Sequence, residues 1–416
     1  MAQLETDKLQ GVNVLVLDPT GYLRVQCNAL EREQGAELIY LKTTEIDEAL
    51  QQVEAQSIQV FLALLSDHPD LELGLMEAVQ ERFPEVIRIV FTSHLTMRQA
   101  FFASEVTHHA LLDTCPAETL VQAIQTGQRL TRILFKQDIL RYMSVLNMQV
   151  ELPQSYVQIR KKMRREALSP KVIADLLKAE PEVTGHLMTL VNSAWYGYHR
   201  EVGTPMEAAS LLDARTLRDL LLAAHLFAAF PENERWKSFP FSTLQQRSML
   251  VGKAAQHLCR AVKARPYVQN QAFVAGLLHD IGIQVLAARS AGVYQEIMSE
   301  AVSLDQPLYA LEKLEFGVTH AEVGAHLMYT WNMPTAVIEA VLFHHFPNAS
   351  QTPGFSVLMA VHVADALVRS MDNTMGCSLA SKLNNAFINR EGMEKPLMAW
   401  QILIADFQEE VMLGMQ

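Results

Sequence analysis

The spacing of apolar residues changes once along this 416-residue chain, and that change constrains the fold more than any other feature. Up to about residue 130, short apolar runs alternate with segments of helical spacing. After Pro116 the apolar residues recur at helical spacing almost to the C-terminus, without a convincing strand pattern. The sequence therefore predicts two structural classes in one chain, an α/β domain followed by an all-helical domain.

The α/β part is predicted from five short apolar runs. They are Val12–Leu17, Glu37–Leu41, Val60–Leu65, Val86–Phe91 and Ala110–Leu112. Segments of helical spacing, such as Thr44–Val53 and Leu71–Arg82, lie between them. Buried strands that alternate with helices are typical of a doubly wound parallel sheet. Five strands in this length fit a flavodoxin-like order.

The sequence divides into four predicted segments. They are an α/β domain at 11–130, a linker helix at 131–148, a helical domain at 149–350, and helices at 351–416 that complete or cover that domain. We expect Ala117 to about Met148 to form one long helix. Pairs such as Ser169-Pro170 and Thr204-Pro205 predict helix starts, because proline opens a helix well and interrupts one badly.

Charge and composition argue against several classes of protein. Residues 1–130 contain 8 Lys and Arg against 19 Asp and Glu, a balance of −11, whereas the remainder has a balance of −1. An acidic domain repels nucleic acid and anionic membranes, so neither is expected as a partner. No apolar run approaches the roughly 20 residues that span a bilayer, and the polar N-terminus lacks the layout of a secretory signal. The four cysteines are scattered without a Cys-X-X-Cys pair, which argues against a disulfide framework. We expect a cytoplasmic protein.

The first domain resembles a response-regulator receiver in its alternation, length and position. That family binds Mg²⁺ with a strand-end acid, accepts the phosphoryl group on an Asp, and contacts the phosphate with a Thr or Ser and a Lys. Asp18 and Thr92 match the acid and the hydroxyl position. Leu64 stands at the acceptor position and Cys115 at the position of the Lys. Since phosphoryl transfer needs both lost groups, the resemblance implies a degenerate receiver that serves for interaction.

Histidines and acids recur in the second half of the chain at the ends of apolar helical segments. The members of this set are His279, Asp280, His320, His344, His345 and Asp365. Imidazoles and carboxylates that converge from several helices are the ligands of a divalent metal site. The sequence therefore identifies these residues as candidate ligands.

Two motifs resemble the HDOD branch of the HD superfamily. Glu180-Pro181 precedes Asn192-Ser193-Ala194 as in the HDOD signature. His279-Asp280 resembles the His-Asp pair of the superfamily, and Asp365 its downstream acid. The remaining candidate histidines resemble positions that supply further ligands in the related HD-GYP phosphodiesterases. The resemblance implies an all-α HD-type domain in a family regarded as regulatory.

One metal ligand of the superfamily is replaced in this chain. The family spacing places its upstream His at Arg247, and Arg cannot coordinate a cation. Its guanidinium can instead put a fixed positive charge where a metal would sit, forked onto Asp280 or Asp365. His257 is the nearest alternative but falls on another helix face. The Gly-Tyr-Pro hallmark of the HD-GYP enzymes is also missing.

The sequence predicts a bacterial-type signal-transduction protein that is non-catalytic and acts through contacts with other signalling proteins. Two alternatives stay open. One is a metal-dependent phosphohydrolase or cyclic-nucleotide phosphodiesterase, in which the His/Asp set binds Fe, Mn, Zn or Ni and activates water. The other is a nucleotide-binding sensor, in which Arg247 grips a phosphate. No cofactor is firmly predicted, and a homodimer stays open.

Overall fold

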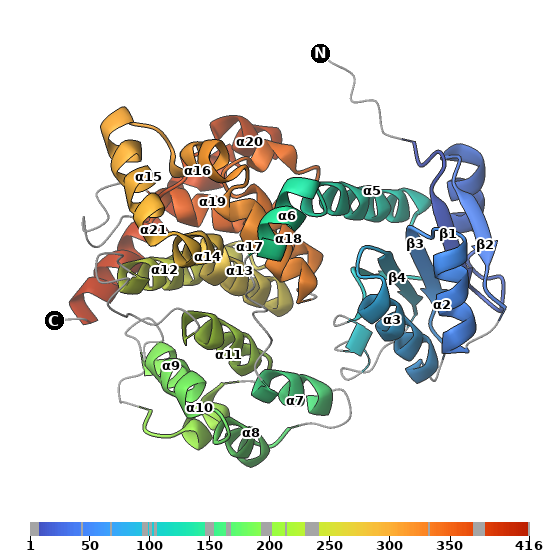
Figure 1. Ribbon diagram of the computed structural model, residues 1–416, viewed down its shortest axis with the longest axis horizontal. Coiled ribbons are helices and arrows are strands. Elements are labelled where there is room, and N and C mark those ends of the chain that lie inside the picture. The colour runs from blue at the N-terminus through green and yellow to red at the C-terminus, as the bar shows by residue number, and fades with distance from the viewer. Residues whose placement is uncertain are drawn as a thin grey trace. The chain divides into compact units, whose positions relative to one another are not determined.

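The computed structural model describes residues 8–42, 45–66, 69–93, 99, 102–103, 106–145, 154–163, 168–192, 202–212, 214–228, 241–331, 333–368 and 379–414. The chain forms two compact units (Figure 1). Unit 1 is Met1–Phe135 and unit 2 is Lys136–Gln416.

Unit 1 is built on a five-stranded parallel sheet with the strand order β2-β1-β3-β4-β5. The strands are β1 (Asn13–Leu17), β2 (Glu37–Tyr40), β3 (Val60–Leu64), β4 (Ile87–Thr92) and β5 (His109–Leu112). Val14 of β1 lies opposite Leu38 of β2 on one side and Val60 of β3 on the other. The predicted flavodoxin-like sheet is confirmed.

Helices cover both faces of this sheet (Figure 1). They are α1 (Arg24–Asn28), its π-helical continuation η1 (Ala29–Glu33), α2 (Ile46–Ala55), α3 (Asp70–Arg82) and α5 (Ala117–Leu134). Leu15 and Leu17 face α2 and α3, whereas Val14 and Val16 face α1 and α5. Because alternate residues of a strand point to opposite faces, both sets must be apolar, and this explains the continuous apolar runs.

The expected single helix from Ala117 to about Met148 is wrong. The structure ends α5 at Leu134 and begins α6 at Gln137. Phe135 leaves helical geometry, with φ −102° and ψ 21°. No Pro or Gly stands at this break, so the composition gave no sign of it.

The described residues of unit 2 form helices. They are α6 (Gln137–Val145), α7 (Gln154–Met163), α8 (Pro170–Leu177), α9 (Pro181–Asn192), α10 (Pro205–Leu211), α11 (Ala214–Ala228), α12 (Phe241–Ala261), α13 (Pro266–Leu278), α14 (Ile281–Arg289), α15 (Ala291–Leu304), α16 (Leu308–Phe316), α17 (His320–Thr330), α18 (Thr335–Phe343), the 3₁₀ turn η3 (Pro347–Ala349), α19 (Val357–Leu367), α20 (Asn385–Arg390) and α21 (Glu394–Gly414). Proline is the first residue of α8, α9 and α10, as the paired breaks predicted, and it is also the first residue of α13, where no break was predicted. Ser169 and Thr204 cap α8 and α10 through their side chains.

The centre of unit 2 is the packing of α12 against α13 and α19. At the crossing, a Cβ on Gly252 would lie 2.7 Å from the carbonyl oxygen of Phe273, and one on Gly276 would lie 2.7 Å from the Cα of Gly252. The two glycines therefore permit a close backbone approach. The stretch Pro266–Ala288 is long and apolar enough to cross a membrane, but 89% of its apolar window is buried inside the structure. It is a core segment of unit 2.

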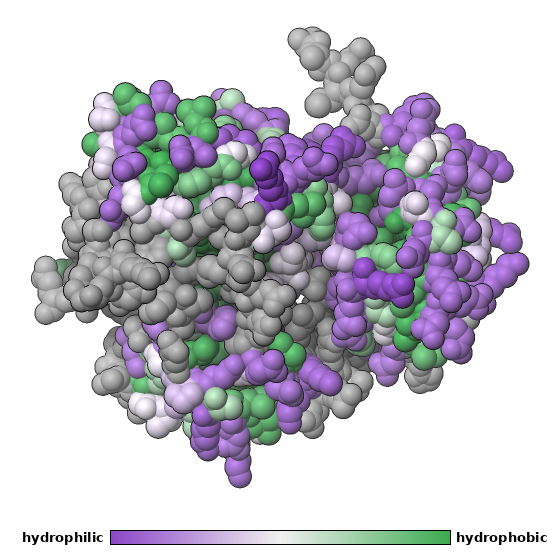
Figure 2. Space-filling view, viewed as in Figure 1, coloured by the Kyte–Doolittle hydropathy of each residue, from purple (hydrophilic) through white to green (hydrophobic). Residues whose placement is uncertain are grey.

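The surface of unit 2 has apolar side chains on one pair of helices. Figure 2 shows hydrophobic residues gathered over α15 and α16. Val302, Leu304 and Leu314 are the exposed large apolar residues there, and Leu314 is 82% exposed. This pair of helices also contributes a buried acid to the site described next.

Candidate functional site

The His279-Asp280 pair lies at the junction of two buried helices. His279 ends α13 and Asp280 precedes α14, and both side chains are almost fully buried. The Nδ1 of His279 lies 2.7 Å from the carbonyl oxygen of Gly276, and a carbonyl can only accept, so Nδ1 carries the proton. The Nε2 atom of this ring therefore faces the two acids of the site, at 3.1 Å from Asp280 and 3.4 Å from Asp365.

A close contact between backbones brings α14 to α17. A Cβ placed on Gly282 would lie 2.0 Å from the carbonyl oxygen of His320. Only glycine fits this position, since every other residue would push the two helices apart. The first turn of α17 is fixed by a capping box between Thr319 and Glu322. These features position His320 beside Asp280.

Arg247 occupies one half of the site. Its Nη2 donates to Asp365 Oδ1 at 2.6 Å and to the Asp365 carbonyl at 2.9 Å. Its Nη1 lies 3.5 Å from Asp280 Oδ2 and 3.3 Å from His279 Nε2. Arg247 is only 5% exposed, so the guanidinium is a buried cation between the two carboxylates.

A second set of ligand atoms lies on the other side of Asp280. One ligand atom from each of Asp280, His320, His344 and His345 lies within 4.8 Å of the others. Asp280 Oδ1 is 3.5 Å from His320 Nε2 and 3.7 Å from His344 Nε2. Asp280 thus turns Oδ2 to the guanidinium and Oδ1 to the histidines.

The outer nitrogen of each of these histidines is held by a partner. His320 Nδ1 contacts Glu312 Oε2 at 2.7 Å, and His344 Nδ1 contacts the Val341 carbonyl at 2.7 Å. His345 Nδ1 contacts Ser381 Oγ at 2.7 Å. Because Nδ1 is engaged in each ring, the three Nε2 atoms are the ones that face inward. This is the usual arrangement around metal-binding histidines.

The cluster is balanced in charge. Burial opposes charge on His279, but the carboxylates of Asp280 and Asp365 outweigh it and raise the pKa of the imidazole to about 10. Burial likewise opposes charge on His320, and Glu312 raises its pKa above the usual value. Two histidines behave in the opposite way. Burial lowers the pKa of His344 to about 3 and that of His345 well below its usual range, so both present lone pairs.

These donors fit one divalent ion rather than two. Asp280 Oδ1, Asp280 Oδ2 and His344 Nε2 are buried atoms without a hydrogen-bond partner among the described residues, although cations lie near both oxygens. On the histidine side, Asp280 Oδ1, the Nε2 atoms of His344 and His345 and, after loss of its proton, His320 Nε2 would make a four-ligand set of the kind that holds Zn²⁺ and related ions. On the other side, the guanidinium stands where a second cation would need a ligand.

The sequence-predicted residues thus fall into two groups around Asp280. Arg247, His279 and Asp365 form one group, and His320, His344 and His345 the other. His257 points elsewhere, since its ring packs on Phe407 of α21 at 4.8 Å between centroids.

Sequence reasoning missed the residues that hold these groups in place. They are Tyr294, Glu312, Ser381 and Gly282. The Tyr294 hydroxyl donates to Glu312, which in turn holds His320. No signal marked Glu312 or Ser381, because neither lies in a motif with the residue that it contacts. Gly282 lies two residues beyond Asp280, and this closeness to the His-Asp pair is the signal that could have found it.

The residues that suggested the HDOD signature are structural where they are described. Glu180 accepts hydrogen bonds from the backbone N–H groups of Gln154 and Ser155 at the start of α7. Asn192 bonds both backbone polar groups of Val202 through its side-chain amide. Ser193 and Ala194 of the signature lie outside the described residues. Glu180 and Asn192 therefore hold the backbone at the start of α7 and at Val202, just before α10.

In unit 1 the receiver-type residues have other uses. The Asp18 carboxylate accepts hydrogen bonds from the backbone N–H groups of Thr20, Tyr22 and Leu23, so it closes a turn before α1. Leu64 packs with the apolar cluster on one face of the sheet. Thr92 ends β4, and burial raises the pKa of Cys115. Asp67, the carboxylate three residues past Leu64, lies outside the described residues.

Comparison with known proteins identifies a domain within unit 2. Residues 150–347 match the HDOD domain family. The chain is 24% identical over 225 residues to an uncharacterized protein of Treponema pallidum (strain Nichols), which covers 53% of this chain and 42% of that protein. The chain thus spans less than half the length of this relative.

Two solved structures share the fold. An HDOD domain protein of unknown function from Geobacter sulfurreducens matches with a TM-score of 0.50 and 21% identity, covering 69% of this chain and 95% of that one. A proposed signal transduction protein from Marinobacter aquaeolei VT8 matches with a TM-score of 0.52 and 17% identity, covering 94% of this chain and 86% of that one. This chain therefore carries an HDOD domain preceded by a receiver-like α/β domain.

Proposed function

We propose that this protein is a cytoplasmic regulator whose HDOD domain is non-catalytic and which transmits signals through contacts with other signalling proteins. The observation that carries this proposal is the buried Arg247 guanidinium on Asp365 and Asp280. It supplies the positive charge that a metal ion would otherwise supply to these carboxylates. A group that cannot release its charge or bind water cannot activate a nucleophile.

The histidine half of the site supports a single resident metal without turnover. We propose that Asp280, His320, His344 and His345 hold one divalent ion, with Fe, Mn, Zn and Ni as the candidates that suit nitrogen and oxygen donors. With Zn²⁺, four protein ligands close a tetrahedral site, whereas a hydrolytic metal needs an open position for water. Such an ion would fix helices α14, α17 and α18 relative to one another.

The nucleotide-sensor alternative has less support. Arg247 would have to release Asp365 to grip a phosphate, and this would leave two buried carboxylates without their strongest cation. The phosphohydrolase alternative depends on a second metal or an open ligand position, and the guanidinium stands against both. The phosphohydrolase alternative would show itself as turnover in the test below.

The exposed apolar residues on α15 and α16 support a protein partner. Val302, Leu304 and Leu314 face solvent, whereas the inner sides of these helices carry Tyr294 and Glu312 into the site. Apolar side chains grouped on a surface are typical of protein contacts. We propose this surface as one contact region for a signalling partner.

The test is metal content and phosphoesterase activity of the protein purified without chelator. Elemental mass spectrometry should find no more than one Fe, Mn, Zn or Ni per chain. A panel of phosphomonoesters, phosphodiesters and cyclic nucleotides should show no turnover. His257→Gln, on the same helix as Arg247 but outside the site, is the matched control. Turnover that Asp280→Asn abolishes and His257→Gln retains would overturn the non-catalytic proposal.

A further inference from the structure

Ser381 lies outside the matched HDOD region and touches both halves of the site. Its backbone N–H donates to Asp365 Oδ2 at 3.0 Å, on the oxygen that Arg247 does not take. Its hydroxyl oxygen lies 2.7 Å from His345 Nδ1 and 3.3 Å from the His344 carbonyl. Ser381 is 7% exposed, so these contacts are shielded from water.

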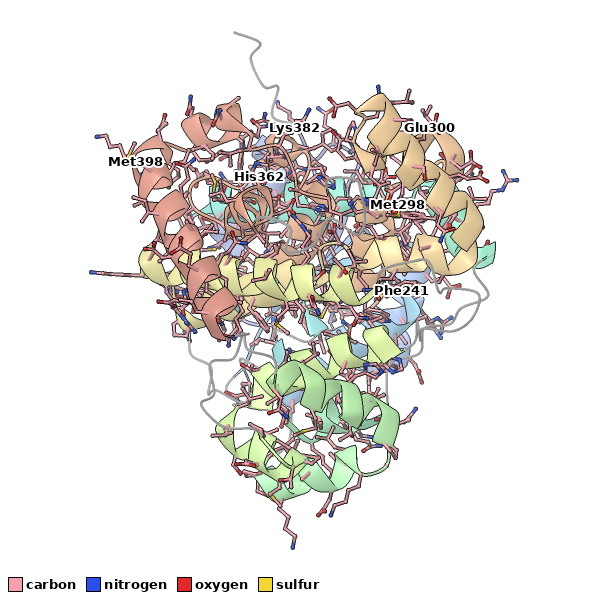
Figure 3. The ribbon with its side chains drawn as sticks, turned by 90° about the vertical axis from the view of Figure 1, so that its left-hand side faces the viewer. Phe241, Met298, Glu300, His362, Lys382 and Met398 are labelled. Carbon is pink, nitrogen blue, oxygen red and sulfur yellow. The ribbon has the colours of Figure 1, made fainter. Side chains whose placement is uncertain are left out.

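The segment that carries Ser381 is bound at a further point. Residues 379–384 are here called the strap. The backbone N–H of Asn384 donates to His362 Nε2 at 2.9 Å, and His362 Nδ1 donates to the His344 carbonyl at 2.7 Å. Figure 3 labels His362 inside unit 2 and Lys382, the exposed neighbour of Ser381, nearer its edge. The strap therefore passes beside the backbone of His344, with Ser381 bound to Asp365 at one point and Asn384 bound to His362 at another.

The strap leads directly into the C-terminal helices. Asn384 caps α20 by accepting from Phe387 N–H, and Phe387 packs on the His362 ring. Arg390 at the end of α20 donates to the carbonyl of Ser350. α20 then contacts α21. The strap thus links Ser381 to α20 and, through α20, to α21.

The hydrogen bonds at Ser381 depend on what His345 binds through Nε2. A neutral imidazole carries one proton. If Nε2 coordinates a cation, the proton is on Nδ1, which donates to Ser381 Oγ, and the Ser381 hydroxyl is free to donate to the His344 carbonyl. Without a cation, Nε2 contacts only His320 Nε2, at 2.9 Å, and a bound cation would fix the proton on Nδ1 and the orientation of the ring on Ser381.

We propose that Ser381 is a positioning residue for His345 and that it couples metal occupancy of the site to the docking of the strap and helices α20 and α21. The inference rests on the metal site proposed above. Occupancy aligns the chain from His345 through Ser381 to the His344 carbonyl and so tightens the strap. Since linkage is reciprocal, a docked strap strengthens metal binding by the same factor. A bound metal ion would therefore stabilise the docking of α20 and α21 on the site.

The test uses the full chain, stripped with chelator and titrated with Zn²⁺ alone. Zn²⁺ affinity is measured by competition with a chromophoric chelator, and hydrogen exchange is followed over residues 379–391. Ser381→Ala should weaken Zn²⁺ binding tenfold to a hundredfold, as expected for loss of a partner that orients a ligand. Ser381→Thr, which keeps the hydroxyl, should restore the affinity. Zn²⁺ should slow exchange of the strap in the native protein but not in Ser381→Ala.

Ser350→Ala is the matched control. Ser350 is a buried serine that donates to Glu339 and lies near α20, but it touches none of the proposed ligands. Its loss should change stability without changing Zn²⁺ affinity. If the native protein binds no Zn²⁺ or other candidate ion, both the metal site and the coupling are overturned. If Zn²⁺ binds but Ser381→Ala keeps native affinity, or exchange of the strap is unchanged, the coupling alone is overturned.

Discussion

The two units have each departed from the chemistry of the family that they resemble, but in opposite ways. In unit 1 the positions for phosphoryl transfer hold an apolar residue at Leu64 and a thiol at Cys115, while Asp18 has become the cap of a turn. In unit 2 the polar cluster is kept almost whole, and one position holds a cation, Arg247, where the superfamily has a neutral ligand.

The difference follows from burial. The receiver-type residues lie at strand ends near solvent, where each can be replaced independently. The HD-type acids Asp280 and Asp365 are almost completely buried, and removing one charge from such a set leaves the others uncompensated. A buried cluster can therefore lose a metal ligand only if another cation, here the Arg247 guanidinium, balances the acids.

Removing the buried cation should have the largest effect. Arg247→Ala leaves Asp280 and Asp365 without their guanidinium, so we expect a loss of about 3–5 kcal/mol in the free energy of unfolding. Urea unfolding followed by circular dichroism measures it. Arg260→Ala, at the exposed end of the same helix, is the control and should cost less than about 0.5 kcal/mol. Equal effects of the two variants would mean that the guanidinium does not balance the cluster.

The second-largest loss of stability is expected where α14 and α17 approach each other closely. Gly282→Ala places a methyl group against the backbone of His320, so we expect a loss of roughly 1–3 kcal/mol and weaker metal binding. Gly292→Ala on α15 has no atom within 4 Å of its added Cβ and should stabilise the protein by about 0.4–1 kcal/mol. A stable Gly282→Ala protein with unchanged metal affinity would show that the spacing of these helices is not critical.

The pH dependence of stability should separate two histidines of the same cluster. The folded protein keeps His344 neutral, with a pKa of about 3, so the unfolded chain binds more protons between pH 3 and about 6.5. Stability therefore falls as the pH drops from 7 to 5, by about 1–2 kcal/mol for this residue. His279, with a pKa raised to about 10, stabilises fully below about pH 6.5 and loses that contribution as the pH rises through 10.

Variants of the chelator-treated protein test this pair. His344→Gln should flatten the acid side of the stability profile, and His279→Gln should flatten the alkaline side. Thermal unfolding at each pH gives the profiles. Identical profiles for the two variants would contradict the opposite protonation states assigned to these rings.

The smallest effect is expected in unit 1. Asp18→Ala removes the acceptor for the N–H groups before α1 and should cost roughly 0.5–2 kcal/mol, as for loss of a helix cap. Asp47→Ala on the exposed first turn of α2 is the control. Intact mass spectrometry after incubation with acetyl phosphate should show no phosphoryl group on the native protein. A phosphoryl adduct that Asp18→Ala removes would mean that unit 1 keeps receiver chemistry.

The sequence by itself determined the two structural classes, the order of the sheet and the set of candidate ligands. Apolar periodicity carries this information because strands and helices bury residues at different spacings, so the pattern is local. The same local rule failed at Phe135, where a helix ends without Pro or Gly. Capping and turn geometry at that point depend on packing rather than on composition.

Only the tertiary structure decided how the candidate ligands divide. It placed Arg247 on Asp365 at 2.6 Å, gathered three histidines on the other oxygen of Asp280, and brought Ser381 to His345 from 36 residues away. Such contacts depend on helix crossings, such as that of Gly252 with Gly276, which no short motif encodes. The sequence determines which side chains are available as ligands. The packing of helices far apart in the sequence determines which carboxylates Arg247 neutralises and which carboxylate oxygen faces the histidines.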